Sequence, residues 1–186
     1  DFPTAVKFAN TFIKNGVTVH RATKEFFVNG KSYPAGSLVF MTDQAFRPHI
    51  LDLFEPQDHP DDFQYEGGPP NPPYDNAGYT LAYQMGIEFD RIMDPVDGPF
   101  EVISGFAESV KGVIANAPNA TGYLVNHAVN DAAILTNRLL AEKQDVYWIS
   151  ESLQAGGWDW PAGTIYIPSS RKADAIIEEA AEGLGI

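Results

Sequence analysis

The chain contains no cysteine, and this absence excludes several kinds of chemistry at once. Disulfide bonds, thiolate metal sites and a cysteine nucleophile all require the missing side chain. Basic residues are also scarce, because 12 Lys and Arg stand against 25 Asp and Glu and give a formal net charge of −13. A surface of this sign repels phosphate backbones and acidic lipids, so we expect no nucleic-acid partner.

Long hydrophobic runs are missing as well. No apolar stretch approaches the ~20 residues that span a bilayer, so we expect no membrane insertion. The 186 residues are 44% hydrophobic and 20% charged, which is typical of a globular domain. The sequence does not begin with Met, and it lacks the basic and apolar regions of a signal peptide. These features predict a domain excised from a larger protein.

The strongest pattern is an internal repeat that aligns without a gap at an offset of 127 residues. Residues 5–40 correspond to residues 132–167, with seven identities in 36 positions. The identical residues of the first copy are Ala5, Asn10, Val19, Gly30, Pro34, Ala35 and Gly36, and those of the second copy are Ala132, Asn137, Val146, Gly157, Pro161, Ala162 and Gly163. A preserved pattern over this length indicates a duplication.

Each copy predicts the same order of elements: an amphipathic helix, a strand, a hairpin with a glycine turn, and a closing helix. The predicted segments are helices at 5–13, 43–54, 132–140 and 171–182 and strands at 17–21 and 145–149. A further strand at 121–127 precedes the second copy, and one at 88–92 follows the first. Neither has a counterpart in the other copy, so both ends of the chain are expected to be clipped.

A strand, a helix and a strand in succession favour a parallel sheet. We therefore predict one α/β domain over 1–186, with a mostly parallel central sheet and helices on both faces. It is made of half-repeats 1–93 and 99–186, and the first contains a Pro-rich insertion at 55–80 that holds six of the 14 prolines.

Several strings resemble one family. They are GVTVHRATKEFFVNGKSYPAGS at 16–37, LFEPQDHP at 53–60, PPYDNAGYTL at 72–81 and QMGI at 84–87. This set is similar to the region that follows the catalytic domain in large bacterial zinc-carboxypeptidase-like proteins. The resemblance implies a class I glutamine amidotransferase-like, three-layer fold of the flavodoxin or Rossmann type. It also implies a periplasmic or extracellular location.

The resemblance implies that the chemistry lies elsewhere in the parent protein. The family binds zinc through a His-x-x-Glu pair and a distant His on the preceding domain. None of the four histidines here has Glu at the third following position, so zinc is expected only in the parent's catalytic domain and no cofactor on this chain. The amidotransferase nucleophile is a Cys, which the chain lacks. We expect no catalytic residue and no metal ligand here, and the parent's catalytic domain as partner.

Seven residues remain as candidates for an interaction site. His127 is expected where a strand gives way to a helix, although turn and capping chemistry explains it as well. Trp158 and Trp160 concentrate aromatic surface on the second hairpin, where stacking on sugars competes with ordinary packing. The others belong to the family-like strings and either bind a ligand or anchor the long loop; they are Glu55, Gln57, Tyr74 and Asp75.

The sequence thus predicts a non-catalytic accessory domain that packs against or modulates a carboxypeptidase-like catalytic domain. Two alternatives stay open. The chain could be a peptide- or glycan-binding module that uses the 55–80 loop and the tryptophan hairpin, or a divergent hydrolase that uses His127. The acidic string at 58–62 resembles a cation site, but a solvated loop explains it more simply.

Overall fold

The computed structural model describes residues 1–56, 60–72, 80–115 and 117–186. The chain divides into two compact units. We call residues 7–107 the N-unit, and residues 1–6 together with 108–186 the C-unit. Helix α1 (Phe2–Lys14) contributes its first residues to the C-unit and the rest to the N-unit.

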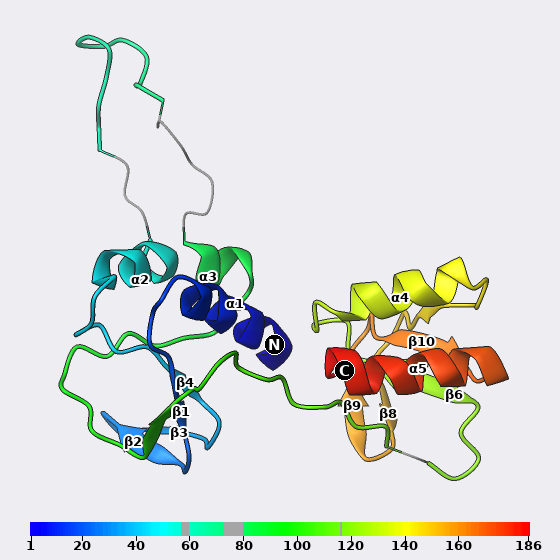
Figure 1. Cartoon of the computed structure of the whole chain (residues 1–186). Coiled ribbons are helices and arrows are strands. Elements are labelled where there is room, and N and C mark those ends of the chain that lie inside the picture. The colour runs from blue at the N-terminus through cyan, green and yellow to red at the C-terminus, as the bar shows by residue number, and fades with distance from the viewer. Residues whose placement is uncertain (57–59, 73–79, 116) are drawn as a thin grey trace. The chain divides into compact units, whose positions relative to one another are not determined.

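The N-unit packs helices against a small antiparallel sheet (Figure 1). Its strands are β1 (His20–Ala22), β2 (Phe26–Val28), β3 (Lys31–Tyr33), β4 (Leu38–Val39) and β5 (Phe100–Val102). Strand β1 lies between β4 and β5, and β2 pairs with β3 as a separate hairpin. Helices α2 (Arg47–Phe54) and α3 (Leu81–Gln84) complete the unit.

An aromatic cluster fills the N-unit core. Helix α1 places Phe8 and Phe12 four residues apart on its buried face. Phe40 and Phe54 lie against both rings, with centroid separations between 4.9 and 6.2 Å. The helix ends at Lys14, and a Schellman turn follows: Gly16 has a left-handed φ of 84°, and the Val17 N–H donates to the Phe12 carbonyl.

The C-unit repeats this order of elements. It contains β6 (Gly122–Val125), α4 (Ala132–Ala141), β7 (Tyr147–Trp148), β8 (Leu153–Ala155), β9 (Trp158–Trp160), β10 (Ile165–Pro168) and α5 (Arg171–Leu184). Strand β10 lies between β6 and β7, and β8 pairs with β9. The core is aliphatic, and its fully buried side chains include Leu135, Leu139 and Ile167.

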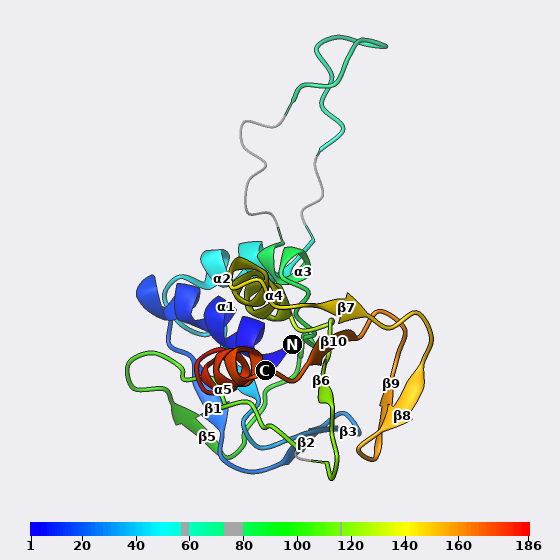
Figure 2. The same ribbon diagram turned by 90° about the vertical axis from the view of Figure 1, so that its right-hand side faces the viewer.

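The prediction of a mostly parallel central sheet with helices on both faces is wrong. Every pairing among the described strands is antiparallel, in sheets of two or three strands, so the class I glutamine amidotransferase-like sandwich is wrong too. Strands β6 and β7 do flank a helix and run the same way, but β10 lies between them. Helices α4 and α5 contact each other, and both pack on the face of β10 that buries Ile165 and Ile167 (Figure 2).

The strand expected at 88–92 is also absent, since these residues have no regular structure and the next strand is β5 at Phe100. The segment is held by polar contacts instead, with Asp90 accepting hydrogen bonds from Lys31 and Tyr33. Strand formation needs a neighbouring strand to satisfy its backbone groups, and β1 takes β5 in that place.

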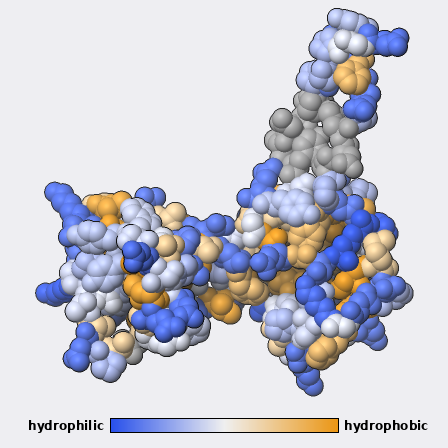
Figure 3. Space-filling model, turned by 180° about the vertical axis from the view of Figure 1, so that it is seen from behind, coloured by the Kyte–Doolittle hydropathy of each residue, from blue (hydrophilic) through white to orange (hydrophobic). Residues whose placement is uncertain are grey.

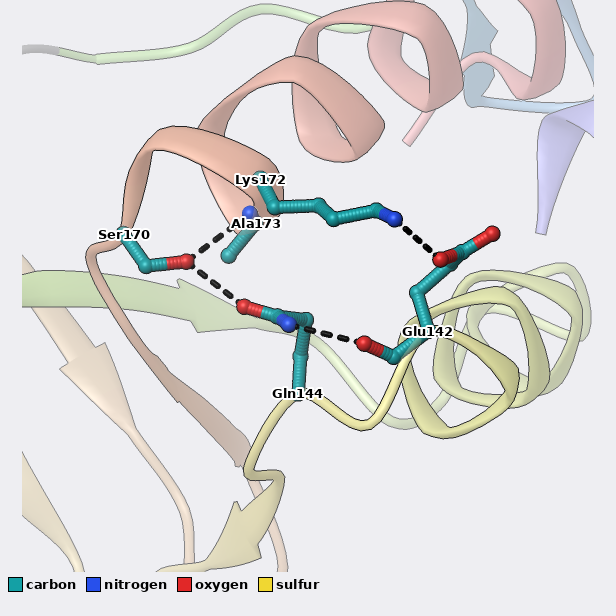
Figure 4. Close-up of polar contacts among 5 residues, drawn as sticks. All are labelled: Glu142, Gln144, Ser170, Lys172 and Ala173. Atoms are coloured by element: carbon teal, nitrogen blue, oxygen red, sulfur yellow. Dashed lines mark hydrogen bonds and ion pairs between the residues drawn. The ribbon is translucent and has the colours of Figure 1, made fainter.

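Helix α5 begins at a side-chain cap that also fastens it to the turn after α4 (Figure 4). The Ser170 Oγ accepts from the Ala173 N–H at 3.0 Å and donates to the Gln144 Oε1 at 2.6 Å. Gln144 in turn donates to the Glu142 carbonyl, and Lys172 forms an ion pair with the Glu142 carboxylate. One serine therefore satisfies the helix start and links the two helices of the C-unit.

We expect Ser170→Ala to lower the free energy of unfolding by about 1 kcal/mol, because the Ala173 N–H loses its acceptor. Urea denaturation followed by circular dichroism measures this change. Ser170→Asn keeps a capping oxygen and should recover most of the loss. Equal destabilisation by both variants would contradict the capping role.

Candidate functional site

Three aromatic side chains of the C-unit are more than half exposed, one on the second hairpin and two on β7. Trp158 is 66% exposed, and Trp148 and Tyr147 on the neighbouring strand β7 are 61% and 52% exposed. Hydrophobic residues interrupt the polar surface of each unit (Figure 3). Trp160, the other predicted tryptophan, is half-buried, and its Nε1 donates to the Ala155 carbonyl at 3.0 Å.

A shallow depression lies beside Trp160 and has a volume of about 310 Å³. It is lined by Ser152, Leu153, Gln154, Asp159, Trp160 and Pro161. The indole of Trp160 is fixed by its bond to Ala155, and the Asp159 carboxylate is fixed by a 2.6 Å hydrogen bond from Gln154. One wall is therefore apolar and the other anionic, which suits a ligand group with an apolar body and a positive charge nearby.

The equivalent place in the N-unit is filled by the chain itself. Phe26 and Tyr33 occupy the positions of Leu153 and Trp160, and their rings stack at a centroid separation of 5.0 Å. The ring of Phe100, on β5, lies edge-on against Phe26 at 4.9 Å. The N-unit thus shows an aromatic side chain seated on a hairpin of the same design.

The first hairpin also binds a carboxylate. Lys31 Nζ lies 2.5 Å and Tyr33 Oη 3.1 Å from Asp90 Oδ2. The hydrogen bond from Lys31 holds the pKa of Asp90 below its ordinary value, and the same bond raises the pKa of Lys31. Desolvation, together with the bond to Asp90, raises the pKa of Tyr33.

This contact predicts a pH dependence with a definite sign. A carboxyl whose pKa is lower in the folded chain adds stability above its unfolded pKa, and this stability is lost as the pH falls below about 4 through the folded value. We expect the Asp90 carboxyl, followed by NMR, to titrate below the ordinary range of Asp. In Lys31→Gln its midpoint should move upward, whereas Lys24→Gln should leave it in place. An unchanged midpoint in Lys31→Gln would refute this cause.

His127 lies in the turn between β6 and α4 and is exposed. A methyl group at Gly163 would come within 3.4 Å of its ring, so the imidazole lies over that glycine. The neighbouring polar side chains make local contacts: Asn126 accepts from the Ala128 N–H, and Asn130 donates to Thr4.

Glu55 ends α2 and anchors the long loop. Its carboxylate lies 2.7 Å from Arg91 Nη1, and its carbonyl accepts from the Thr80 hydroxyl at 2.8 Å. Residues 55 and 80 are thereby tied together at the two ends of the Pro-rich insertion. Gln57, Tyr74 and Asp75 lie outside the described residues, as do Asp58 and His59 of the acidic string.

Within the described residues, no three His, Asp or Glu side chains come together as a metal-binding group. No helix of those residues has both the length and the apolar character that crossing a membrane requires.

Sequence reasoning identified Trp160 but missed Leu153, Gln154 and Asp159, which line the same depression. The repeat contained a signal for them. Leu153 aligns with buried Phe26, and Asp159 aligns with Ser32, so both positions differ in kind between otherwise matching hairpins.

Scans of the chain against protein-family models, curated proteins and solved structures find no match.

Proposed function

We propose that this chain is a non-catalytic accessory domain of a secreted zinc-carboxypeptidase-like protein, and that it contacts another part of that protein through the C-unit. The family-like strings at 16–37, 53–60, 72–81 and 84–87 motivate the choice of parent. The observation that carries an interaction role is the contrast between the two hairpins. The N-unit hairpin exposes Phe27 but has Phe100 and Asp90 packed against its other side chains, whereas the C-unit hairpin exposes Trp158 and borders an open depression.

Exposed tryptophan favours a contact role over a purely structural one. Large aromatic side chains contribute much of the binding energy at protein interfaces, because each buries a large area with few rotatable bonds. Zinc and the catalytic groups belong to the preceding domain of the proposed parent, which acts in the periplasm or outside the cell. The role of this chain is then to pack against that domain or to modulate access to it.

Two measurements test the proposal. The native gene product should be several times larger than 20.4 kDa by intact mass, and its upstream peptides should include His-x-x-Glu. The purified chain should release no C-terminal amino acid from peptides, with or without added Zn²⁺. A native product near 20 kDa, or zinc-dependent peptidase activity of the chain alone, would contradict it.

A second candidate function is a peptide- or glycan-binding module, which the depression beside Trp160 favours. All three tryptophans lie between residues 148 and 160, so their fluorescence reports on this surface. Titration with peptides and with cell-wall glycans should then change the emission. A flat response to both would exclude the module.

A further inference from the structure

We propose that the free edge of β7 binds an extended basic strand of another polypeptide, antiparallel to β7, and that an aromatic side chain of this strand enters the depression beside Trp160. The inference rests on the proposed function, because it specifies what the C-unit contacts. Within the described residues β7 pairs with β10 alone, so its other edge is open.

The two units share one backbone design at this place. The pairs His20–Val39 and Tyr147–Tyr166 are equivalent at the offset of 127, and so are the hairpin pairs Phe26–Tyr33 and Leu153–Trp160. The turn hydrogen bonds agree as well, since Gly36 N–H donates to the Ala22 carbonyl and Gly163 N–H donates to the Ile149 carbonyl. What binds beside β1 therefore shows what fits beside β7.

In the N-unit the edge of β1 holds β5. His20, Arg21 and Ala22 face Val102, Glu101 and Phe100 in antiparallel register. Three further hydrogen bonds fix the ends of this pair: Ile103 N–H donates to the Val19 carbonyl at 2.9 Å, and Thr23 donates to the Pro99 carbonyl through both its N–H and its hydroxyl. This register brings the Phe100 ring onto Phe26 of the hairpin.

The C-unit has the same groups but no strand upon them in the described residues. Val146, Trp148 and Ser150 are the counterparts of Val19, Arg21 and Thr23, and Ser150 again offers an N–H and a hydroxyl. The counterpart of the Phe100 site is the hairpin face made by Leu153 and Trp160, which line the depression. Leucine is smaller than Phe26 and tryptophan is larger than Tyr33, so this face differs in shape from that of the N-unit, and the depression beside it is the place for an aromatic ring.

The charge of the sequence around β7 indicates which kind of strand binds there. Residues 144–170 contain the carboxylates Asp145, Glu151 and Asp159 and no Lys, Arg or His. Moreover, Glu101 of β5 faces Arg21, whereas the equivalent position on β7 is the exposed Trp148. A Lys or Arg in place of Glu101 would lie over that indole, where a cation is stabilised, and the acidic sequence around β7 attracts a positive charge. The bound strand therefore carries an aromatic residue followed by a basic one.

The same charges disfavour a second copy of this chain in the register centred on Trp148. If two β7 strands paired antiparallel about Trp148, Asp145 of one copy would face Glu151 of the other on both sides. Like charges directly opposite each other destabilise a pair of strands. Addition of a foreign strand to a sheet edge, with main-chain bonds for affinity and pockets for specificity, avoids this repulsion.

The test uses a fluorescent peptide with the sequence of residues 98–104 carrying Glu101→Lys, titrated with the whole chain and followed by anisotropy. We expect saturable binding. The matched peptide that keeps Glu should bind more weakly, and replacement of the peptide's Phe by Ala should lower affinity about tenfold or more, since the buried ring is lost.

Backbone pairing is tested by N-methylation of the peptide. N–H groups alternate in direction along a strand, so a methyl group on the Ile nitrogen removes the donor to the Val146 carbonyl, whereas one on the neighbouring Val nitrogen points away. The first should weaken binding about tenfold and the second should change it little. Equal effects of the two methyl groups would overturn the strand geometry.

Two protein variants complete the test. Leu153→Ala alters the depression and should weaken binding, whereas Leu140→Ala, at an exposed position of α4 outside the lining, should retain it; circular dichroism confirms that both fold. No saturable binding of the basic peptide, or a concentration-dependent dimer through β7 in ultracentrifugation, would overturn the inference. If the peptide fails but Trp148 and Trp158 are shielded from acrylamide in the larger native protein, the strand is wrong and the accessory function stands.

Discussion

Phe12→Ala is expected to lower the free energy of unfolding of the N-unit by about 3–5 kcal/mol. Phe12 is fully buried, and its ring contacts Phe8 at 5.0 Å and Phe40 at 4.9 Å between centroids. Truncation leaves a cavity that neighbouring rings on α1 and α2 cannot fill without moving. A loss of this size is comparable with the whole stability of many small domains.

The measurement separates the two units without labels. The phenylalanine bands of the near-ultraviolet circular dichroism report largely on the N-unit, which contains every Phe except Phe2, and tryptophan fluorescence reports on the C-unit, because all three tryptophans lie within residues 148–160. In Phe12→Ala the first signal should be lost at a lower urea concentration. Lys7→Ala, at an exposed position of the same helix, should change stability by no more than about 0.5 kcal/mol. A loss below about 1 kcal/mol for Phe12→Ala would contradict the packing described.

Gly122→Ala should detach β6 from β10 and cost about 1–3 kcal/mol. A methyl group at Gly122 would lie 2.4 Å from the Ile167 carbonyl oxygen and 2.7 Å from the Tyr166 ring, which is closer than atoms can approach. The carbonyl belongs to the backbone of the paired strand, so it cannot turn away as a side chain could.

Hydrogen exchange measures this detachment directly. The Ser169 N–H donates to the Thr121 carbonyl at 3.0 Å, and its exchange should accelerate in Gly122→Ala. Gly183→Ala is the matched control, because a methyl group there meets no atom within 4 Å and Ala favours the interior of α5. It should stabilise the chain slightly. Unchanged exchange at Ser169 in Gly122→Ala would show that β6 tolerates the methyl group.

The local elements were largely predictable from the sequence. Apolar spacing predicted the helix at 5–13, and Gly16 marked its end, as α1 and its left-handed turn show. The prediction of a helix at 171–182 agrees with α5. These features depend on neighbours a few residues away, and such neighbours are visible in a single sequence.

Sheet topology was not predictable in the same way. The pattern at 121–149 correctly placed β6, α4 and β7, but it could not show that β10, some twenty residues further on, would lie between the two strands. The site was missed in part for the same reason. In the N-unit the hairpin side chain Phe26 is covered by Phe100, which is far away in the sequence. Local composition does not show whether a distant segment covers Leu153 and Trp160 of the C-unit in the same way.

The identical register of the two hairpins makes them exchangeable parts. Residues 26–33 and 153–160 have the same length, the same strand pairs and left-handed residues at the same two turn positions, Asn29 and Gly30 in one and Gly156 and Gly157 in the other. A chimaera that carries either hairpin in either unit would therefore keep the same strand pairs and the same turn. The duplicated hairpin is a scaffold present twice in this protein, and its side chains can change what it binds while its backbone stays the same.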